Sequence, residues 1–374
     1  MIKVYTEANN IISPLGFNTV ENFQNVLKGK SGVQIIKNSG LSSEQISVSY
    51  INTNIDNAFS EIGDIEKYTR FEKLAILSIN DVLQKTNLNI DKSKTLLILS
   101  TTKGNINLLD ENLKHSFSKE RLKLHTTAKI ISDFFDFKDN PIVVSNACIS
   151  GLAAVVLAQH LIKQGLYDNI IINGTDILSK FVVSGFQSFM SLSDKRCKPF
   201  DAERNGLNLG EASASIILTK EKQEIEVSEG STSNDANHIS GPSRTGEGLL
   251  LAIKNTIKDK KDIDFISAHG TATPYNDNME AVAISRAGLA NVPTNSLKAY
   301  FGHTLGAAGV LEIIISLEAL KNNVLINTLT CDNLGVTEEI NIIKETKEQK
   351  INNVLKLASG FGGGNAAVLF LKNE

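Results

Sequence analysis

One stretch of this sequence constrains the fold more than any other: a β-branched run that turns, through small and polar residues, into an apolar segment. Residues 142–144 (Ile-Val-Val) follow a proline and predict a short buried strand. The Ala-, Leu- and Val-rich run that continues to about Lys163 predicts a buried helix, and the turn between them holds Asn146, Cys148 and Ser150. Such a strand–turn–helix unit is typical of α/β folds.

The turn places Cys148 at the N-terminus of the expected helix. Free N–H groups and the helix dipole at this position stabilise a thiolate, and the same N–H groups can hold a thioester oxygen as it becomes an oxyanion. An isolated cysteine is more often a small buried hydrophobic residue. Both interpretations stay open on this stretch alone.

Length and composition exclude several functional classes. The 374 residues correspond to about two domains or one large duplicated domain, and 41% hydrophobic residues can form a sizeable core. A formal net charge of -3 gives no support to nucleic acid or an anionic membrane as partner. Three scattered cysteines, Cys148, Cys197 and Cys331, suit a reducing cytoplasm better than a disulfide framework or a zinc site. We expect no leader peptide, because the N-terminus lacks an apolar segment, and no apolar run reaches membrane-spanning length.

Strand and helix patterns alternate along the chain, which predicts an α/β fold with a largely parallel sheet. The expected strands are residues 2–6, 95–100, 142–144, 170–174, 214–218 and 263–268. The expected helices before the cysteine are residues 19–27, 70–86 and 119–135, with a loop at 9–16. Residues 31–62 are polar and predict no clear element.

Two glycine-rich segments indicate that the chain is duplicated. Residues 206–218 and 360–370 are each a glycine-rich loop followed by a strand that starts with small residues. The turn and helix around Cys148 likewise resemble residues 303–311. We therefore predict two α/β halves, residues 1–222 and 223–374, that meet in a charged segment.

Two histidines of the second half lie at expected strand-to-helix junctions. His269 comes directly after the expected strand 263–268, at the sheet edge where α/β proteins build their sites, and His303 opens a Gly- and Ala-rich helix. Either histidine alone would more often be structural, but one cysteine and two histidines at such junctions together indicate a reaction centre. Lys298, in an apolar surrounding, and Glu312, in the following helix, predict a partly buried ion pair.

Together these motifs resemble the decarboxylating β-ketoacyl-[acyl-carrier-protein] synthases of the thiolase-fold superfamily. The resemblance covers nearly the whole chain. It is carried by Asn146-Ala147-Cys148-Ile149-Ser150-Gly151, His269-Gly270-Thr271-Ala272-Thr273-Pro274, Lys298 with Gly302-His303, and Gly306-Ala307-Ala308-Gly309. It implies a five-layer αβαβα sandwich made of two duplicated α/β halves. The second histidine indicates the elongating Cys-His-His branch rather than the chain-starting Cys-His-Asn branch.

The resemblance implies a role for each residue of the centre. Cys148 would hold the acyl chain as a thioester, and its backbone N–H would form an oxyanion hole with that of Phe361. His269 and His303 would donate hydrogen bonds to the malonyl thioester while CO2 leaves. Lys298, held by Glu312, would keep the charge and histidine geometry in order.

Further positions match supporting residues of the family. Thr271 and Thr273 match residues that hydrogen-bond the phosphopantetheine arm. Asp277 and Glu280 match structural acidic positions in the loop after the first histidine, with surface loop charges as the alternative. Ser359 lines the substrate where the family often has a gating phenylalanine, which implies a wider pocket or a looser gate. No metal or redox cofactor is implied.

The implied partner is an acyl carrier protein. Lys195, Arg196 and Lys198 form a small basic group that is either a docking edge for this acidic protein or an ordinary solvated loop. The family forms dimers through the strand that leads into Cys148. We expect a homodimer, with a heterodimer of this chain and a paralogous synthase or chain-length factor as the alternative.

Two other functions stay open. Non-catalytic chain-length factors usually lack the nucleophilic cysteine, which this chain has at position 148. Degradative thiolases that use CoA thioesters usually carry a second catalytic cysteine near the C-terminal glycine-rich loop, and residues 359–365 contain none. The short chain and its Gly210-Glu211-Ala212-Ser213 segment, where the family has Gly-Glu-Gly-Ala, fit a specialised pathway such as that of an aryl polyene.

Overall fold

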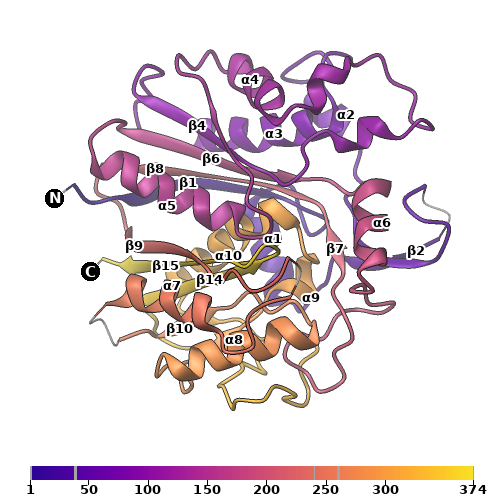
Figure 1. Cartoon of the computed structure of the whole chain (residues 1–374). Helices are drawn as coiled ribbons and strands as arrows, with labels where there is room; N and C mark the ends of the chain where they lie inside the picture. The colour runs from indigo at the N-terminus through magenta and orange to yellow at the C-terminus, as the bar shows by residue number, and fades with distance from the viewer. Residues whose placement is uncertain (1, 38–39, 240, 259–261, 374) are drawn as a thin grey trace.

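The computed structural model describes residues 2–37, 40–239, 241–258 and 262–373. Its central feature is a ten-stranded mixed sheet in the order β11-β10-β14-β15-β9-β1-β8-β6-β4-β5 (Figure 1). The strands of the first half are β1 (Tyr5–Ile12), β4 (Thr95–Ser100), β5 (Ile142–Val144), β6 (Asn169–Asp176) and β8 (Ala212–Thr219). Those of the second half are β9 (Ile225–Asn234), β10 (Phe265–Ser267), β11 (Thr294–Asn295), β14 (Asn353–Gly360) and β15 (Gly364–Lys372).

The two halves repeat one strand order, so the predicted duplication is confirmed. In the first half β5, β4 and β6 are parallel, β8 is antiparallel to β6, and β1 is antiparallel to β8. In the second half β11, β10 and β14 are parallel, β15 is antiparallel to β14, and β9 is antiparallel to β15. The halves join where Tyr5 and Thr6 of β1 pair with Glu226 and Ile225 of β9. The predicted boundary lies in the connection between β8 and β9.

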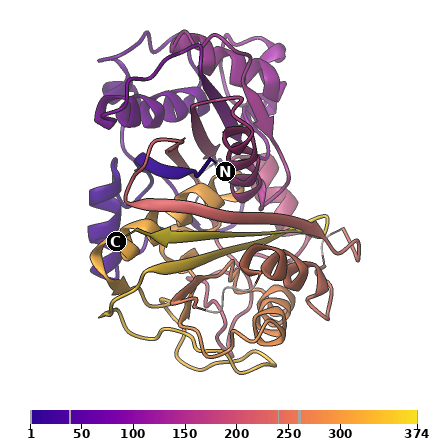
Figure 2. The same ribbon diagram turned by 90° about the vertical axis from the view of Figure 1, so that its left-hand side faces the viewer.

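Helices form three layers around the two half-sheets, which confirms the five-layer sandwich (Figures 1 and 2). The central layer is α5 (Ser150–Lys163) and α10 (Ala308–Asn322), which contact each other and strands of both halves. On the outer face of the first half lie α3 (Arg70–Lys85) and α4 (Leu124–Phe134). On that of the second half, α7 (Glu247–Ile257) packs on β9 and β15, and α8 (Pro274–Arg286) packs on α7.

Smaller elements complete the chain. The short helices are α1 (Thr19–Leu27), α2 (Ile55–Phe59), α6 (Lys180–Ser188) and α9 (Lys298–Phe301), with 3-10 turns η1 (Ile106–Leu109), η2 (Lys119–Leu122) and η3 (Leu305–Ala307). The short strands are β2 (Val33–Ile36), β3 (Ile46–Ser49), β7 (Leu209–Gly210), β12 (Val324–Leu325) and β13 (Lys347–Glu348). Within the described ranges, no helix is both long enough and apolar enough to cross a membrane.

The close contact between α5 and α10 positions the reaction centre. A Cβ on Gly151 would lie 2.8 Å from the backbone N of Val310, and one on Gly309 would lie 2.8 Å from that of Leu152. Real Cβ atoms are not found that close to backbone, so only glycine fits at both crossing points. The first turns of the two central helices therefore lie side by side, and Cys148 precedes one of them.

Several sequence expectations need correction. The sheet is mixed rather than largely parallel, because one strand in each half, β8 or β15, runs opposite to both of its neighbours. Residues 9–12 are not loop: Asn9 and Asn10 continue β1 opposite Ile216 and Ser215. The expected helix 119–135 is two elements, η2 and α4, and the unassigned residues 31–62 contain β2, β3 and α2. The strands among these corrections depend on backbone pairing with other strands, which side-chain periodicity does not report.

Candidate active site

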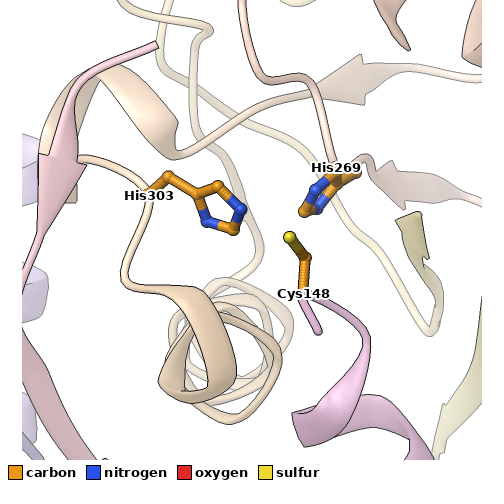
Figure 3. A group of neighbouring side chains, drawn as sticks. All are labelled: Cys148, His269 and His303. Carbon is orange, nitrogen blue, oxygen red and sulfur yellow. The ribbon is translucent and has the colours of Figure 1, made fainter. Parts of the chain in front are cut away.

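Cys148, His269 and His303 converge on one point although they come from three distant segments. One sulfur and one nitrogen from each ring all lie within 4.8 Å of one another. The two ring centroids are 5.1 Å apart and the rings are nearly perpendicular, at 84°. Figure 3 shows the sulfur directed toward the space between the rings. All three side chains are buried, so a thioester reaching them would be shielded from bulk water.

A tight turn presents the cysteine. Ala147 has a left-handed backbone (φ 43°), which is strained for a residue with a side chain. The Ser150 hydroxyl fixes this turn: it accepts from the N–H of Asn146 at 2.8 Å and donates to the carbonyl of Ala147 at 2.6 Å. The backbone N–H groups of Cys148 and Phe361 both face the sulfur. These are the two N–H groups expected to form the oxyanion hole.

Burial keeps the resting thiol neutral, although the helix N-terminus at which it lies favours a thiolate. Burial raises the pKa of the Cys148 thiol to about 11, and the N–H of Phe361 and the charge of Lys298 offset only part of this effect. Removal from water disfavours the charged form more than a helix N-terminus favours it here. The thiol must therefore give up its proton during the reaction.

This raised pKa predicts how Cys148 reacts with iodoacetamide. Only the thiolate is alkylated, so the rate at Cys148 should rise about tenfold per pH unit with no plateau below about pH 10. Peptide mass spectrometry, which separates Cys148 from Cys197 and Cys331, measures the rate at each site. A plateau near neutral pH at Cys148 would show a stabilised thiolate and contradict the neutral thiol.

Both histidines are neutral and offer an N–H to the cavity. The Leu305 N–H donates to Nδ1 of His303 (3.3 Å), and the Lys298 ammonium lies 3.5 Å from Nδ1 of His269. A ring nitrogen that accepts leaves the proton on Nε2. Burial, then Lys298, lowers the pKa of each imidazole well below its usual range. Nε2 of His303 has no partner among the described residues and remains available to a substrate oxygen.

Two buried carboxylates hold the backbone that carries His269. Glu280 accepts the N–H groups of His269 (2.6 Å) and Gly270 (2.7 Å). Asp277 accepts those of Thr271 (2.9 Å), Ala272 (3.1 Å) and Phe200 (2.7 Å). Both carboxylates lie on α8 and are fully buried, so neither the loop placement nor the surface-charge alternative is correct.

Lys298 and Glu312 form the predicted ion pair, and it is fully buried rather than partly. The Lys298 ammonium also donates to the carbonyl of His269 at 3.1 Å. A second lysine that was not expected here joins the pair: Lys356 on β14 is fully buried and lies 2.7 Å from the other oxygen of Glu312. Its signal was a single lysine inside the otherwise apolar run 354–358.

A cavity of about 500 Å³ leads to this centre. Thr271, Thr273 and Ser359 line it, as expected for substrate-contacting residues; the two threonine hydroxyls are 2.9 Å apart, and the Ser359 hydroxyl donates to Asn365 (2.8 Å). The ring of Phe361 stacks on that of Phe186 (5.7 Å between centroids) and meets that of Phe189 edge-on (5.4 Å). Neither phenylalanine was expected at the site, because the segment that carries them, α6 and its C-cap, shows no catalytic motif.

The predicted basic group lies outside this cavity. Lys195 and Arg196 are exposed in the loop before β7, while Lys198 pairs with Glu203 and is partly neutralised. Lys195 and Arg196 remain the groups that an acidic partner would meet.

One thiol and two imidazoles also match three ligands of a zinc site in type and spacing. The Lys298 ammonium, 3.5 Å from a ring nitrogen of His269, would repel a second cation. The expectation of no metal stays a prediction.

The family described as "Beta-ketoacyl synthase, N-terminal domain" matches residues 7–224, and "Beta-ketoacyl synthase, C-terminal domain" matches residues 225–332. A 3-oxoacyl-[acyl-carrier-protein] synthase 2 from Coxiella burnetii is 26% identical over 96% of each chain. A putative polyketide beta-ketoacyl synthase 1 from Streptomyces halstedii is 29% identical over 67% of this chain and 64% of its own.

Solved structures share the fold. A chain from a ketosynthase–chain length factor complex of Xenorhabdus doucetiae superposes with a TM-score of 0.88, at 24% identity, covering 99% of this chain and 98% of its own. A chain of the ishigamide ketosynthase/chain length factor superposes with a TM-score of 0.89, at 20% identity, covering 100% of this chain and 99% of its own.

Proposed function

Because the chain belongs to the β-ketoacyl synthase family of the thiolase-fold superfamily, an acyltransferase class, we propose that it condenses a malonyl thioester with an acyl group held on Cys148. The observation that carries this proposal is one buried thiol within 4.8 Å of two imidazole nitrogens. The reaction would extend an acyl chain by decarboxylative Claisen condensation, as in fatty-acid or polyketide synthesis.

In the first half-reaction, Cys148 takes the acyl group from a carrier protein. The sulfur attacks the thioester carbonyl, and the N–H groups of Cys148 and Phe361 that face it stabilise the oxygen as it becomes negative. The proton of the neutral thiol ends on the departing pantetheine sulfur. The exchange therefore needs no net acid or base.

In the second half-reaction, the Nε2–H groups of His269 and His303 donate to the carbonyl oxygen of the malonyl thioester. The C–C bond to the carboxylate breaks and CO2 leaves. The electron pair of that bond stays on the remaining fragment and forms the enolate that these two donors stabilise. The enolate carbon attacks the acyl carbonyl on Cys148, and the cysteine sulfur leaves and takes up one proton. Thioesters supply the activation, so the proposed reaction uses no metal or redox cofactor.

The proposed partner is an acyl carrier protein, whose acidic surface would meet the exposed Lys195 and Arg196 in the loop before β7. We further propose a dimer through β5, which is the last strand of the sheet and is only half-buried. An unpaired sheet edge favours pairing with a second chain. A copy of this chain or a paralogous chain-length factor would satisfy that edge equally.

The compartment and the pathway are also proposals. Three cysteines that form no disulfide fit a cytoplasmic setting. The short chain and the small Ser359 beside the cavity support a specialised product, such as an aryl polyene or another secondary lipid.

Intact-mass spectrometry after incubation with an acyl carrier protein tests the function. We expect the wild type to gain the mass of one acyl group and the Cys148→Ala variant to gain none. Cys197→Ala is the matched control, because Cys197 is equally buried but does not line the cavity. A wild type that is never acylated would favour the chain-length-factor alternative, and acylation that persists in Cys148→Ala would contradict the assigned nucleophile.

A further inference from the structure

A second buried lysine lies behind His269 and has no part in the reaction described above. Lys356 on β14 pairs in register with Ser267, the last residue of β10, and its side chain is fully buried. Removing an ammonium group from water is unfavourable by several kcal/mol unless partners compensate. The partners of Lys356 therefore indicate what this residue does.

The ammonium of Lys356 makes two hydrogen bonds and one ion pair. It donates to the carbonyls of Ser267 (3.2 Å) and Ala268 (3.0 Å), and it lies 2.7 Å from Oε2 of Glu312. A neutral amine at this position would leave this buried oxygen of Glu312 without the positive charge that faces it. Lys356 is therefore positively charged in this site.

Glu312 bridges two ammonium groups. Its Oε1 pairs with Lys298, and its Oε2 pairs with Lys356. Lys298 also donates to the carbonyl of His269, so the two lysines together hold three successive carbonyls, those of residues 267, 268 and 269. One carboxylate cannot neutralise two cations, and the other carboxyl next to the His269 backbone is that of Glu280. Burial raises the pKa of Glu280 to about 7, so at neutral pH this group offsets only part of the second positive charge.

We propose that Lys356 is a positioning residue: by sharing Glu312 with Lys298, it maintains a positive charge beside His269 that keeps this imidazole neutral during decarboxylation. This inference rests on the proposed function. An imidazolium at position 269 would bind the malonyl carboxylate and stabilise it before CO2 leaves, which opposes the reaction. A neutral ring instead offers its Nε2–H to the thioester oxygen.

Other charged and titratable groups around His269 are the same in every variant tested. Lys298 on α9, Glu312 on α10 and Glu280 on α8 face the residue or its backbone, and His303 and Cys148 lie across the cavity. Burial raises the pKa of Glu280 to about 7 and Lys356 offsets part of this effect, so loss of the lysine also leaves Glu280 more protonated. The His269 titration in variants at position 356 therefore reports the net effect of removing Lys356, including its effect on Glu280.

The test is a ring NMR titration of His269 in wild type, Lys356→Met and Lys356→Gln, with the signal assigned from a His269→Asn variant. Loss of the cation should raise the pKa of His269 by about one unit or more in both variants. The acid limb of malonyl-carrier-protein decarboxylation should move to higher pH by the same amount, because the ring becomes charged earlier as the pH falls. Acylation of Cys148 at neutral pH should stay near that of the wild type.

Glutamine at position 356 keeps N–H donors for the two carbonyls but carries no charge. If His269 in Lys356→Gln titrates as it does in the wild type, Lys356 supplies only hydrogen bonds and the inference is overturned. The glutamine variant alone is sufficient for the test if Lys356→Met does not fold. Lys73→Met is the matched control, because Lys73 is a buried lysine on α3 that pairs with Asp56 (2.6 Å) outside the site. This variant should leave the His269 titration unchanged. The titration needs no substrate, so a wild type that is never acylated would refute the proposed function alone.

Discussion

Replacing Cys148 with glutamine is expected to abolish condensation while leaving decarboxylation of malonyl carrier protein intact. The glutamine side chain is close in size and shape to an acylated cysteine, and its carbonyl oxygen can accept from the N–H groups of residues 148 and 361. No acyl chain can be attached to it, so no 3-oxoacyl product can form. The two imidazoles that face the malonyl thioester are unchanged, so CO2 can still leave.

Mass spectrometry of the carrier protein measures both outcomes at once. Loss of CO2 converts the malonyl group to an acetyl group, whereas condensation gives a longer 3-oxoacyl group. Cys148→Ala is the matched control, because it also lacks the nucleophile but leaves the space of the acyl group empty. If folded Cys148→Gln does not decarboxylate, the cysteine itself takes part in loss of CO2, and the division of roles between thiol and imidazoles is wrong.

The sequence predicted the centre because its residues occupy local junctions that a pattern can reveal. Cys148 and His269 each follow a short β-branched or apolar strand, and His303 precedes a helix rich in small residues. In α/β folds, such junctions lie at one edge of the sheet, so their convergence can be expected without coordinates. The Lys298–Glu312 pair was predictable for a similar reason, since a lysine in an apolar segment needs a partner.

Other features depend on contacts that local patterns do not report. The thiol of Cys148 is neutral because of burial by all the surrounding segments, and a helix N-terminus alone suggests the opposite. Asp277 and Glu280 were expected as structural acidic residues in a loop, with surface charges as the alternative, and the local pattern does not show that five backbone N–H groups converge on them. Lys356 lies within a strand pattern, and only the register of β14 against β10 places it behind His269.

The same limit explains the error in sheet direction. Alternating strands and helices predict parallel neighbours, but β8 and β15 enter next to β6 and β14 in the reverse direction. Both follow the glycine-rich segments by which the duplication was recognised. The sequence therefore shows the repeat but not the reversed strand direction that follows each glycine-rich segment.

Replacing His303 with alanine is expected to lower decarboxylation of malonyl carrier protein by about 10²–10³-fold, the usual effect of removing one donor from such a site. Nε2 of His303 has no partner among the described residues, and the Leu305 N–H at Nδ1 keeps the proton on Nε2. That proton is therefore placed for a substrate oxygen rather than for the fold. Acyl transfer to Cys148, which depends on backbone N–H groups, should change far less.

Comparing the two half-reactions distinguishes a chemical role from a structural one. His303 also joins β7 through its backbone: its N–H donates to Asn208 (2.6 Å), and its carbonyl accepts from Gly210 (3.0 Å). Alanine keeps both of these backbone bonds, so the substitution removes the ring without detaching the segment. His160→Ala, at an exposed histidine on α5, controls for loss of an imidazole as such. An equal fall in acylation and decarboxylation in His303→Ala would mean that the ring supports the cavity wall, and the enolate would then depend on His269 alone.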